Sequence, residues 1–164
     1  MTLVVLVLAV FGTLGSISSF ATLSDASWER GAAFAAAQQA LETMQSEPFV
    51  DVFARYNDTA ADDPAAGAPG ANFTVVGLDP RAADPDGMVG RVEFPVDPAR
   101  PAELREDFAD DAFGFPRDLN ADGVIDAVDH ANDHALLPVR VIVEWRGRSG
   151  NRRVELGTIL RNDG

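Results

Sequence analysis

Hydrophobic and polar positions divide the start of the chain into two parts. Residues Met1–Ser24 contain no Asp, Glu, Lys or Arg, and a helix of that length would reach about 36 Å, beyond the roughly 30 Å of a bilayer's hydrocarbon core. Residues 25–47 instead place polar side chains around an apolar stripe at three- and four-residue steps, formed by Phe34, Ala37, Leu41 and Met44. The pattern predicts one long helix, with a transmembrane half at 1–24 and an amphipathic half at 25–47, ending near Pro48.

Two alternative interpretations of residues 1–24 remain open. A cleaved secretory signal would find a small-x-small site at Ser19-Phe20-Ala21, although no Lys or Arg precedes the apolar run. A buried core helix is the other alternative, although an apolar run of this length exceeds what a globular core usually needs. The absence of flanking positive charge leaves the orientation in a membrane unassigned.

The clearest pattern in the rest of the chain lies near its C-terminus. Residues 138–145 alternate, with Val139, Val141, Val143 and Trp145 on one side. After a turn at 146–151, residues 152–160 return with Val154, Leu156 and Ile159 predicted to face inward. This is the pattern of an antiparallel hairpin with one buried face.

The middle of the chain is less regular. Residues 57–72 are typical of a loop, strand-like runs follow at 72–78 and 88–96 with a turn-rich segment at 79–87 between them, and residues 98–116 are irregular and acidic. We therefore expect an α+β head at 48–164, in which the long N-terminal helix packs on a small antiparallel sheet.

Composition narrows the classes of function. The 164 residues carry a formal net charge of −13 and a pI near 4.3, which argues against nucleic acid and anionic lipid headgroups as partners. The chain has no cysteine, so disulfides, cysteine-ligated zinc and thiol catalysis are excluded. The sequence shows no nucleophile elbow, P-loop or dinucleotide fingerprint, and we expect no enzyme activity.

The strongest chemical motif is a calcium-type loop at residues 118–129. Gly123 at position 6 allows a sharp turn, and Ile125 at position 8 is expected to anchor the loop on the core. The alternative is an ordinary Asp/Asn/Gly turn on an acidic surface. The predicted oxygen ligands for Ca²⁺ are the side chains at positions 1, 3, 5, 9 and 12 and one backbone carbonyl at position 7: Asp118, Asn120, Asp122, Asp126, Asp129 and Val124.

Two other groups of ionisable residues are weaker candidates. His130 and His134 lie four residues apart, but no Glu lies between them and the chain has no third His, so we expect a solvated helix rather than a zinc site. The pairs Asp62-Asp63 and Asp110-Asp111 are expected to be solvated surface.

Both ends of the chain resemble one family. The start, M-T-L-V-V-L-V-L-A-V at 1–10, the segment A-A-A-Q-Q-A-L-E-T-M at 35–44, and the hairpin V-R-V-I-V-E-W at 139–145 with R-R-V-E-L-G-T at 152–158 resemble type IV pilins and type II secretion pseudopilins. The closest resemblance is to the minor, PilV-like or I-type members. It covers about residues 1–50 and 138–162, and the chain departs from the family at Val5, where the family usually has Glu. The family's leader, which ends in Gly, does not precede Met1, so we expect either that the sequence starts after processing or that its start is misassigned.

The resemblance implies a structural subunit of a pilus or pseudopilus. Its partners would be other subunits, through the N-terminal helix, and the inner membrane, with a single-pass anchor and a periplasmic or extracellular head. The family also offers a precedent for a structural calcium ion. The alternative function is a membrane-anchored or secreted calcium-binding interaction domain with no role in a filament.

Overall fold

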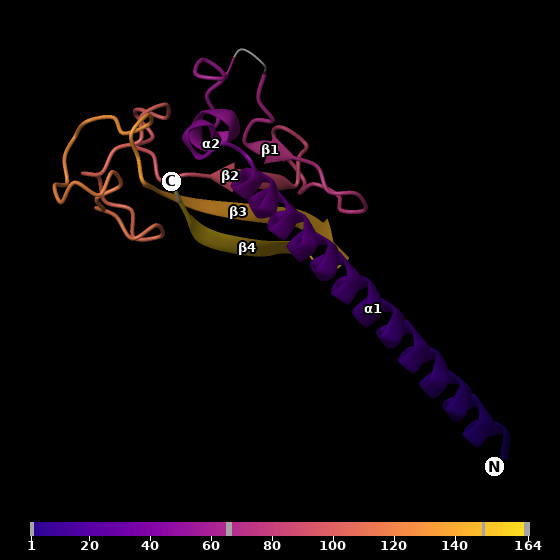
Figure 1. Cartoon of the computed structure of the whole chain (residues 1–164). Coiled ribbons are helices and arrows are strands. Elements are labelled where there is room, and N and C mark those ends of the chain that lie inside the picture. The colour runs from indigo at the N-terminus through magenta and orange to yellow at the C-terminus, as the bar shows by residue number, and fades with distance from the viewer. Residues whose placement is uncertain (1, 65–66, 149, 163–164) are drawn as a thin grey trace.

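The computed structural model describes the backbone of residues 2–64, 67–148 and 150–162, with side chains from Ser24 onward. Its elements are α1 (Thr2–Ser46), α2 (Phe49–Tyr56), β1 (Asn72–Phe73), β2 (Gly90–Glu93), β3 (Leu136–Gly147) and β4 (Gly150–Arg161). The C-terminal part of α1 lies against β3 and β4, whereas its N-terminal part projects away from the head (Figure 1). The acidic loops between β2 and β3 gather at the other end of the head.

The four strands form one antiparallel sheet in the order β1-β2-β3-β4. The predicted hairpin is confirmed, since β3 and β4 pair from Leu136↔Arg161 to Gly147↔Gly150. The four inward residues predicted on β3 are all buried: Val139, Val141, Val143 and Trp145. The assignment of Ile159 on β4 is wrong, because the two-residue period that brings Val154 and Leu156 inward continues to the buried Leu160 and turns Ile159 outward.

Small side chains bring α1 close to the sheet. Ala33, Ala37 and Met44 are fully buried, whereas Phe34, which we placed on the same stripe, is 48% exposed. Leu41 also packs against the core, so the predicted stripe is confirmed except at Phe34, whose place on the buried side is taken by Ala33. Alanine permits a closer approach of helix and sheet than phenylalanine does. Near the edge of this contact, the Trp145 indole Nε1–H donates to Glu29 Oε2 over 3.0 Å.

The middle strands are shorter than predicted. The run at 72–78 is reduced to β1, and Gly77 has a φ of +83° beneath the ring of Trp28, where a Cβ would lie 2.3 Å from a ring carbon. The run at 88–96 is reduced to β2, which ends shortly before Pro95, a residue without an N–H for the ladder. The short helix α2, which the sequence interpretation missed, buries Val52, Phe53 and Tyr56.

The fold class and the localisation expected from the sequence require correction. We expected a pilin-like fold with a transmembrane half-helix joined to an amphipathic half. Among the described residues, no helix has the length and apolar character needed to cross a membrane. The part of α1 with described side chains is Ser24–Ser46, which carries Asp25, Glu29, Arg30 and Glu42. The side chains of residues 1–23, on which the expectation depended, lie outside the described residues.

The described residues therefore form two helices and a four-stranded antiparallel sheet, and no part of the helices searched among them could cross a membrane. The single-pass inner-membrane assignment is withdrawn on the same finding.

Candidate metal centre

The first half of the acidic loop is folded around its own side chains. Asp118 accepts hydrogen bonds from the N–H groups of Ala121 (2.7 Å) and Gly123 (2.9 Å). Asn120 Oδ1 accepts from the N–H of Asp122 over 3.0 Å. Gly123 has a φ of +86°, the left-handed conformation expected of the glycine at this position. The turn predicted from the sequence is thus present, and the side-chain oxygens of Asp118 and Asn120 accept hydrogen bonds from backbone N–H groups of the same turn.

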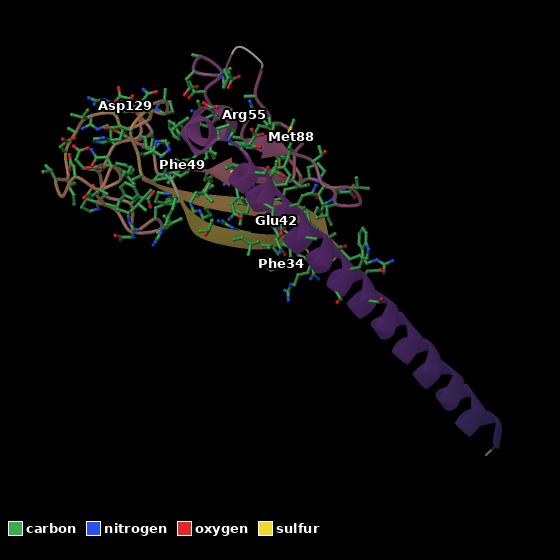
Figure 2. The ribbon with its side chains drawn as sticks, viewed as in Figure 1. Phe34, Glu42, Phe49, Arg55, Met88 and Asp129 are labelled. Carbon is green, nitrogen blue, oxygen red and sulfur yellow. The ribbon has the colours of Figure 1, made fainter. Side chains whose placement is uncertain are left out.

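The second half of the loop is tied to the preceding acidic segment. Asp129 Oδ1 accepts from the N–H of Leu104 over 2.9 Å, and the N–H of His130 donates to the Leu104 carbonyl over 2.8 Å. These two hydrogen bonds hold residues 129–130 beside Leu104, which lies 25 residues before Asp129 in the chain. Figure 2 labels Asp129 among these loops, at the end of the head away from the projecting part of α1.

The side chain of Glu106 is hydrogen-bonded to both halves of the loop. Its side chain is fully buried, with Oε1 accepting from the N–H groups of Leu119 (2.5 Å) and Asn120 (3.3 Å). Its Oε2 accepts from the N–H of Asp126 over 3.3 Å. A buried carboxylate is costly unless it is hydrogen-bonded, and three backbone donors meet that requirement here. Glu106 therefore fixes the separation of the beginning and the end of the loop.

His130 brings a nitrogen ligand to the same place. Its Nε2 lies 3.3 Å from Asp126 Oδ1 and 3.8 Å from Glu106 Oε1, and its Nδ1 lies 3.0 Å from Asp133 Oδ1. One ligand atom from each of Glu106, Asp126 and His130 lies within 4.8 Å of the other two. These three residues could hold a metal ion.

The electrostatics of the group follow from its carboxylates. Burial by itself would lower the pKa of His130, but hydrogen bonds to Asp133 and Asp126 and the charge of Glu106 outweigh it and raise that pKa above its usual value. The pKa of Asp126 is lowered, chiefly by the hydrogen bond from the N–H of Val128, with a further contribution from His130. The site therefore favours a positive charge between His130 and its neighbours.

The six residues predicted to bind Ca²⁺ do not converge on one point in the structure. Of the six predicted ligands, Asp126 alone belongs to the group with Glu106 and His130. Asp118, Asn120 and Asp122 lie in the exposed turn, Val124 is 56% exposed, and Asp129 bonds to Leu104.

Two sequence interpretations near the loop are wrong. His130 and His134 are each 3% exposed and lie in a turn-containing segment, so they are not a solvated helical pair. Ile125 is 49% exposed and does not anchor the loop, because the fully buried Leu119 takes that role. Glu106 was missed altogether, since nothing in its local sequence distinguishes it from the other acidic residues around it.

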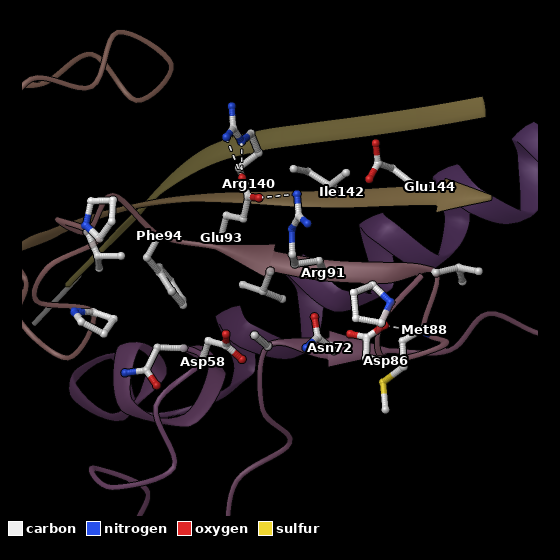
Figure 3. Close-up of a pocket in the computed structure, with 18 of the residues that line it drawn as sticks. Asp58, Asn72, Asp86, Met88, Arg91, Glu93, Phe94, Arg140, Ile142 and Glu144 are labelled. Atoms are coloured by element: carbon white, nitrogen blue, oxygen red, sulfur yellow. Dashed lines mark hydrogen bonds and ion pairs between the residues drawn. The ribbon is translucent and has the colours of Figure 1, made fainter. Parts of the chain in front are cut away.

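A separate groove of about 570 Å³ lies over the sheet on the side shown in Figure 3. Glu93 pairs with both Arg140 (2.6 Å) and Arg91 (2.5 Å), and Arg81 pairs with Glu144 (3.0 Å). Because these lining arginines already have carboxylate partners, we place the candidate site at Glu106, Asp126 and His130 instead.

Comparisons with protein-family models, with curated proteins and with solved structures each found no match to this chain.

Proposed function

We propose that this chain is a structural subunit of the type IV pilin and pseudopilin kind, which assembles through α1 and carries a calcium-binding loop on its head. The observation that carries the proposal is the arrangement of α1. Its C-terminal part packs on β3 and β4, and its N-terminal part projects from the head (Figure 1).

The projecting part of α1 would be stabilised by packing against a partner. Residues 2–24 continue the helix with no Asp, Glu, Lys or Arg, and a helix of that length is about 34 Å long. Helices in proteins gain most of their stability from packing an apolar face against a partner, and a helix without charged residues gains the most from such burial. Copies of the same helix side by side would supply that packing, which supports an assembling subunit.

The outer side of α1 beside the head is also available for contact. The ring of Trp28 lies over Gly77 yet is still 58% exposed, Phe34 is 48% exposed, and Gly31 has open space where a Cβ would stand. A small residue between two exposed aromatic side chains leaves a recess into which a side chain of a neighbouring helix can pack. This surface continues the projecting part toward the head, and we expect neighbouring subunits to cover it.

Sedimentation of the full chain tests assembly. The native chain should form assemblies that grow with concentration, and Leu8→Asp, which puts a charge on the projecting helix, should shift them toward monomers. The control is Ala109→Asp, an exposed position on a head loop. A native chain that stays monomeric at all concentrations, or equal assembly by both variants, would contradict the proposal.

We further propose that the acidic loop binds Ca²⁺. Its turn has the spacing of a calcium loop and the left-handed Gly123, and oxygen side chains are the ligands that Ca²⁺ prefers. Binding requires Asp118 and Asp122 to exchange hydrogen bonds with backbone N–H groups for bonds to the ion.

Calorimetric titration with Ca²⁺ tests the loop. Asp122→Asn should weaken binding at least tenfold, whereas Asp111→Asn, at an exposed carboxylate elsewhere on the acidic segment, should leave it unchanged. Equal calcium affinity in the two variants would contradict the proposal, because it would mean that Ca²⁺ does not bind in the loop at residues 118–129.

The second candidate function is a calcium-binding interaction domain that does not assemble. The observation in its favour is the position of the loop, at the end of the head away from the projecting helix (Figure 2). A chain that binds Ca²⁺ through Asp122 yet stays monomeric would establish this second function over the first.

A further inference from the structure

The group formed by Glu106, Asp126 and His130 has a chemistry that the calcium loop does not. Calcium sites are built from oxygen atoms, whereas this group includes an imidazole nitrogen. Glu106 and His130 are 0% and 3% exposed, so contacts with the surrounding protein determine the positions of both side chains.

The contacts of His130 determine which of its two nitrogens carries the hydrogen in the neutral ring. Nδ1 lies 3.0 Å from Asp133 Oδ1, and a carboxylate can only accept, so Nδ1 carries a hydrogen. In the neutral ring, Nε2 then presents a lone pair. That lone pair faces Asp126 Oδ1 at 3.3 Å and Glu106 Oε1 at 3.8 Å, which also carry lone pairs. Three acceptors that converge in this way require a cation between them, which is a proton on Nε2 in the imidazolium form or a metal ion that replaces that proton.

The separations suit a small divalent metal ion. Ligands about 2.0–2.1 Å from a tetrahedral ion lie about 3.3–3.4 Å from one another. The distance from His130 Nε2 to Asp126 Oδ1 is 3.3 Å, and that to Glu106 Oε1 is 3.8 Å. The largest separation in the group is within 4.8 Å, so a side-chain adjustment of up to about 1.4 Å would bring the three ligand atoms to the spacing of a tetrahedral site.

The surroundings provide what such a site needs beyond its ligands. Asp133 holds the ring of His130 through Nδ1, which is the carboxylate–histidine–metal arrangement that orients an imidazole ligand. Glu106 is held by three backbone N–H groups. The Asp126 side chain is 40% exposed, which gives an ion and a fourth, water ligand access from solvent.

We propose that Glu106, Asp126 and His130 form a centre for a divalent transition metal such as Zn²⁺, oriented by Asp133 and chemically distinct from the calcium loop. Imidazole together with carboxylate suits Zn²⁺ and its neighbours in the first transition series rather than Ca²⁺. The inference goes beyond the proposed function and does not depend on assembly. Asp126 connects the two sites, because it is also position 9 of the loop.

Titration of the full chain with Co²⁺, a coloured stand-in for Zn²⁺, tests the centre. One equivalent should give visible absorption bands of a four- or five-coordinate ion, and Zn²⁺ should displace it. His130→Gln should weaken binding at least 100-fold. The matched control is His134→Phe, which removes the only other histidine of the chain and should leave the bands unchanged. Asp133→Asn should weaken binding 10- to 100-fold, as is usual for a residue that orients a ligand.

Asp122→Asn separates this centre from the calcium loop. It should reduce Ca²⁺ binding and leave Co²⁺ binding intact. Loss of Co²⁺ binding in Asp122→Asn together with its retention in His130→Gln would place the ion in the loop and overturn the inference.

A second measurement on the native chain does not depend on any variant folding. In ¹⁵N spectra of labelled histidine, Zn²⁺ should shift Nε2 of one histidine alone. Absence of any shift at saturating Zn²⁺, with only a proton titrating on that ring, would overturn the inference as well.

Discussion

Replacing Glu106 by alanine is the sharpest test of how the acidic loops are held. The fully buried Glu106 carboxylate accepts hydrogen bonds from the N–H groups of Leu119, Asn120 and Asp126. Alanine removes all three acceptors at once. The loop then loses the group that connects its beginning to its end, and we expect a loss of stability in the absence of any metal ion.

The magnitude follows from the burial of the three donors. A buried donor left without a partner costs about 1–3 kcal/mol. Leu119 is fully buried, and its bond of 2.5 Å is the shortest of the three. Asn120 and Asp126 are partly exposed, so water can replace part of their bonds, at about 0.5–1 kcal/mol each. Relief of a buried charge offsets some of the total, which leaves a destabilisation of about 3 kcal/mol.

Urea unfolding followed by tryptophan fluorescence, with a chelator present, measures this loss. The control is Glu103→Ala, three residues earlier, where the carboxylate is 40% exposed and lies 3.5 Å from Arg100 and 3.9 Å from Arg105. Exposed ion pairs of this kind contribute about 0.5 kcal/mol or less. A Glu106→Ala chain within about 1 kcal/mol of the native one, or no less stable than the control, would refute the assignment of Glu106 as the residue that holds the loop.

Two further predictions concern the sheet and the second histidine. Gly90→Ala should lower the free energy of unfolding by about 1–3 kcal/mol, because its Cβ would lie 2.2 Å from the ring of Phe73. Gly157→Ala, where the nearest atom is 3.8 Å away, should cost far less in the same unfolding assay, and equal losses would contradict the packing described. Burial lowers the pKa of His134, so the stability associated with its neutral form is present above the unfolded-state pKa of 6.5 and is lost as the pH falls. The stability of the native chain relative to His134→Phe should therefore fall between pH 7.5 and pH 5 in chemical unfolding, and a pH-independent difference would contradict it.

The elements that could be predicted from the sequence are those in which a regular pattern repeats over many consecutive residues. The alternation of Val139, Val141 and Val143 identified β3 and its buried face, because a two-residue period carries the same information over the whole strand. The stripe on α1 was predicted on the correct element but with Phe34 on the wrong side. A stripe rich in alanine has a weak contrast between its faces, so the sheet decides the rotation.

The candidate metal site could not be predicted from local sequence patterns, for a different reason. Glu106 meets its partners 13, 14 and 20 residues further along the chain, and no period connects them. His130 was expected in solvent because its neighbours are polar, yet the bond from its N–H to the Leu104 carbonyl draws it inward. Long-range hydrogen bonds of this kind depend on how the loops fold together, which sequence spacing does not record.

Disulfide cross-linking between copies tests the proposed assembly through α1 most directly. The chain has no cysteine, so a single introduced cysteine reports only on its own surroundings, and a disulfide requires Cα atoms within about 7 Å. Cysteines placed one at a time along residues 4–12 should form cross-linked pairs in the full-length chain at helical intervals. Ala109→Cys, on the exposed head loop, should not. Cross-linking that is absent from 4–12, or no stronger there than at position 109, would contradict the account.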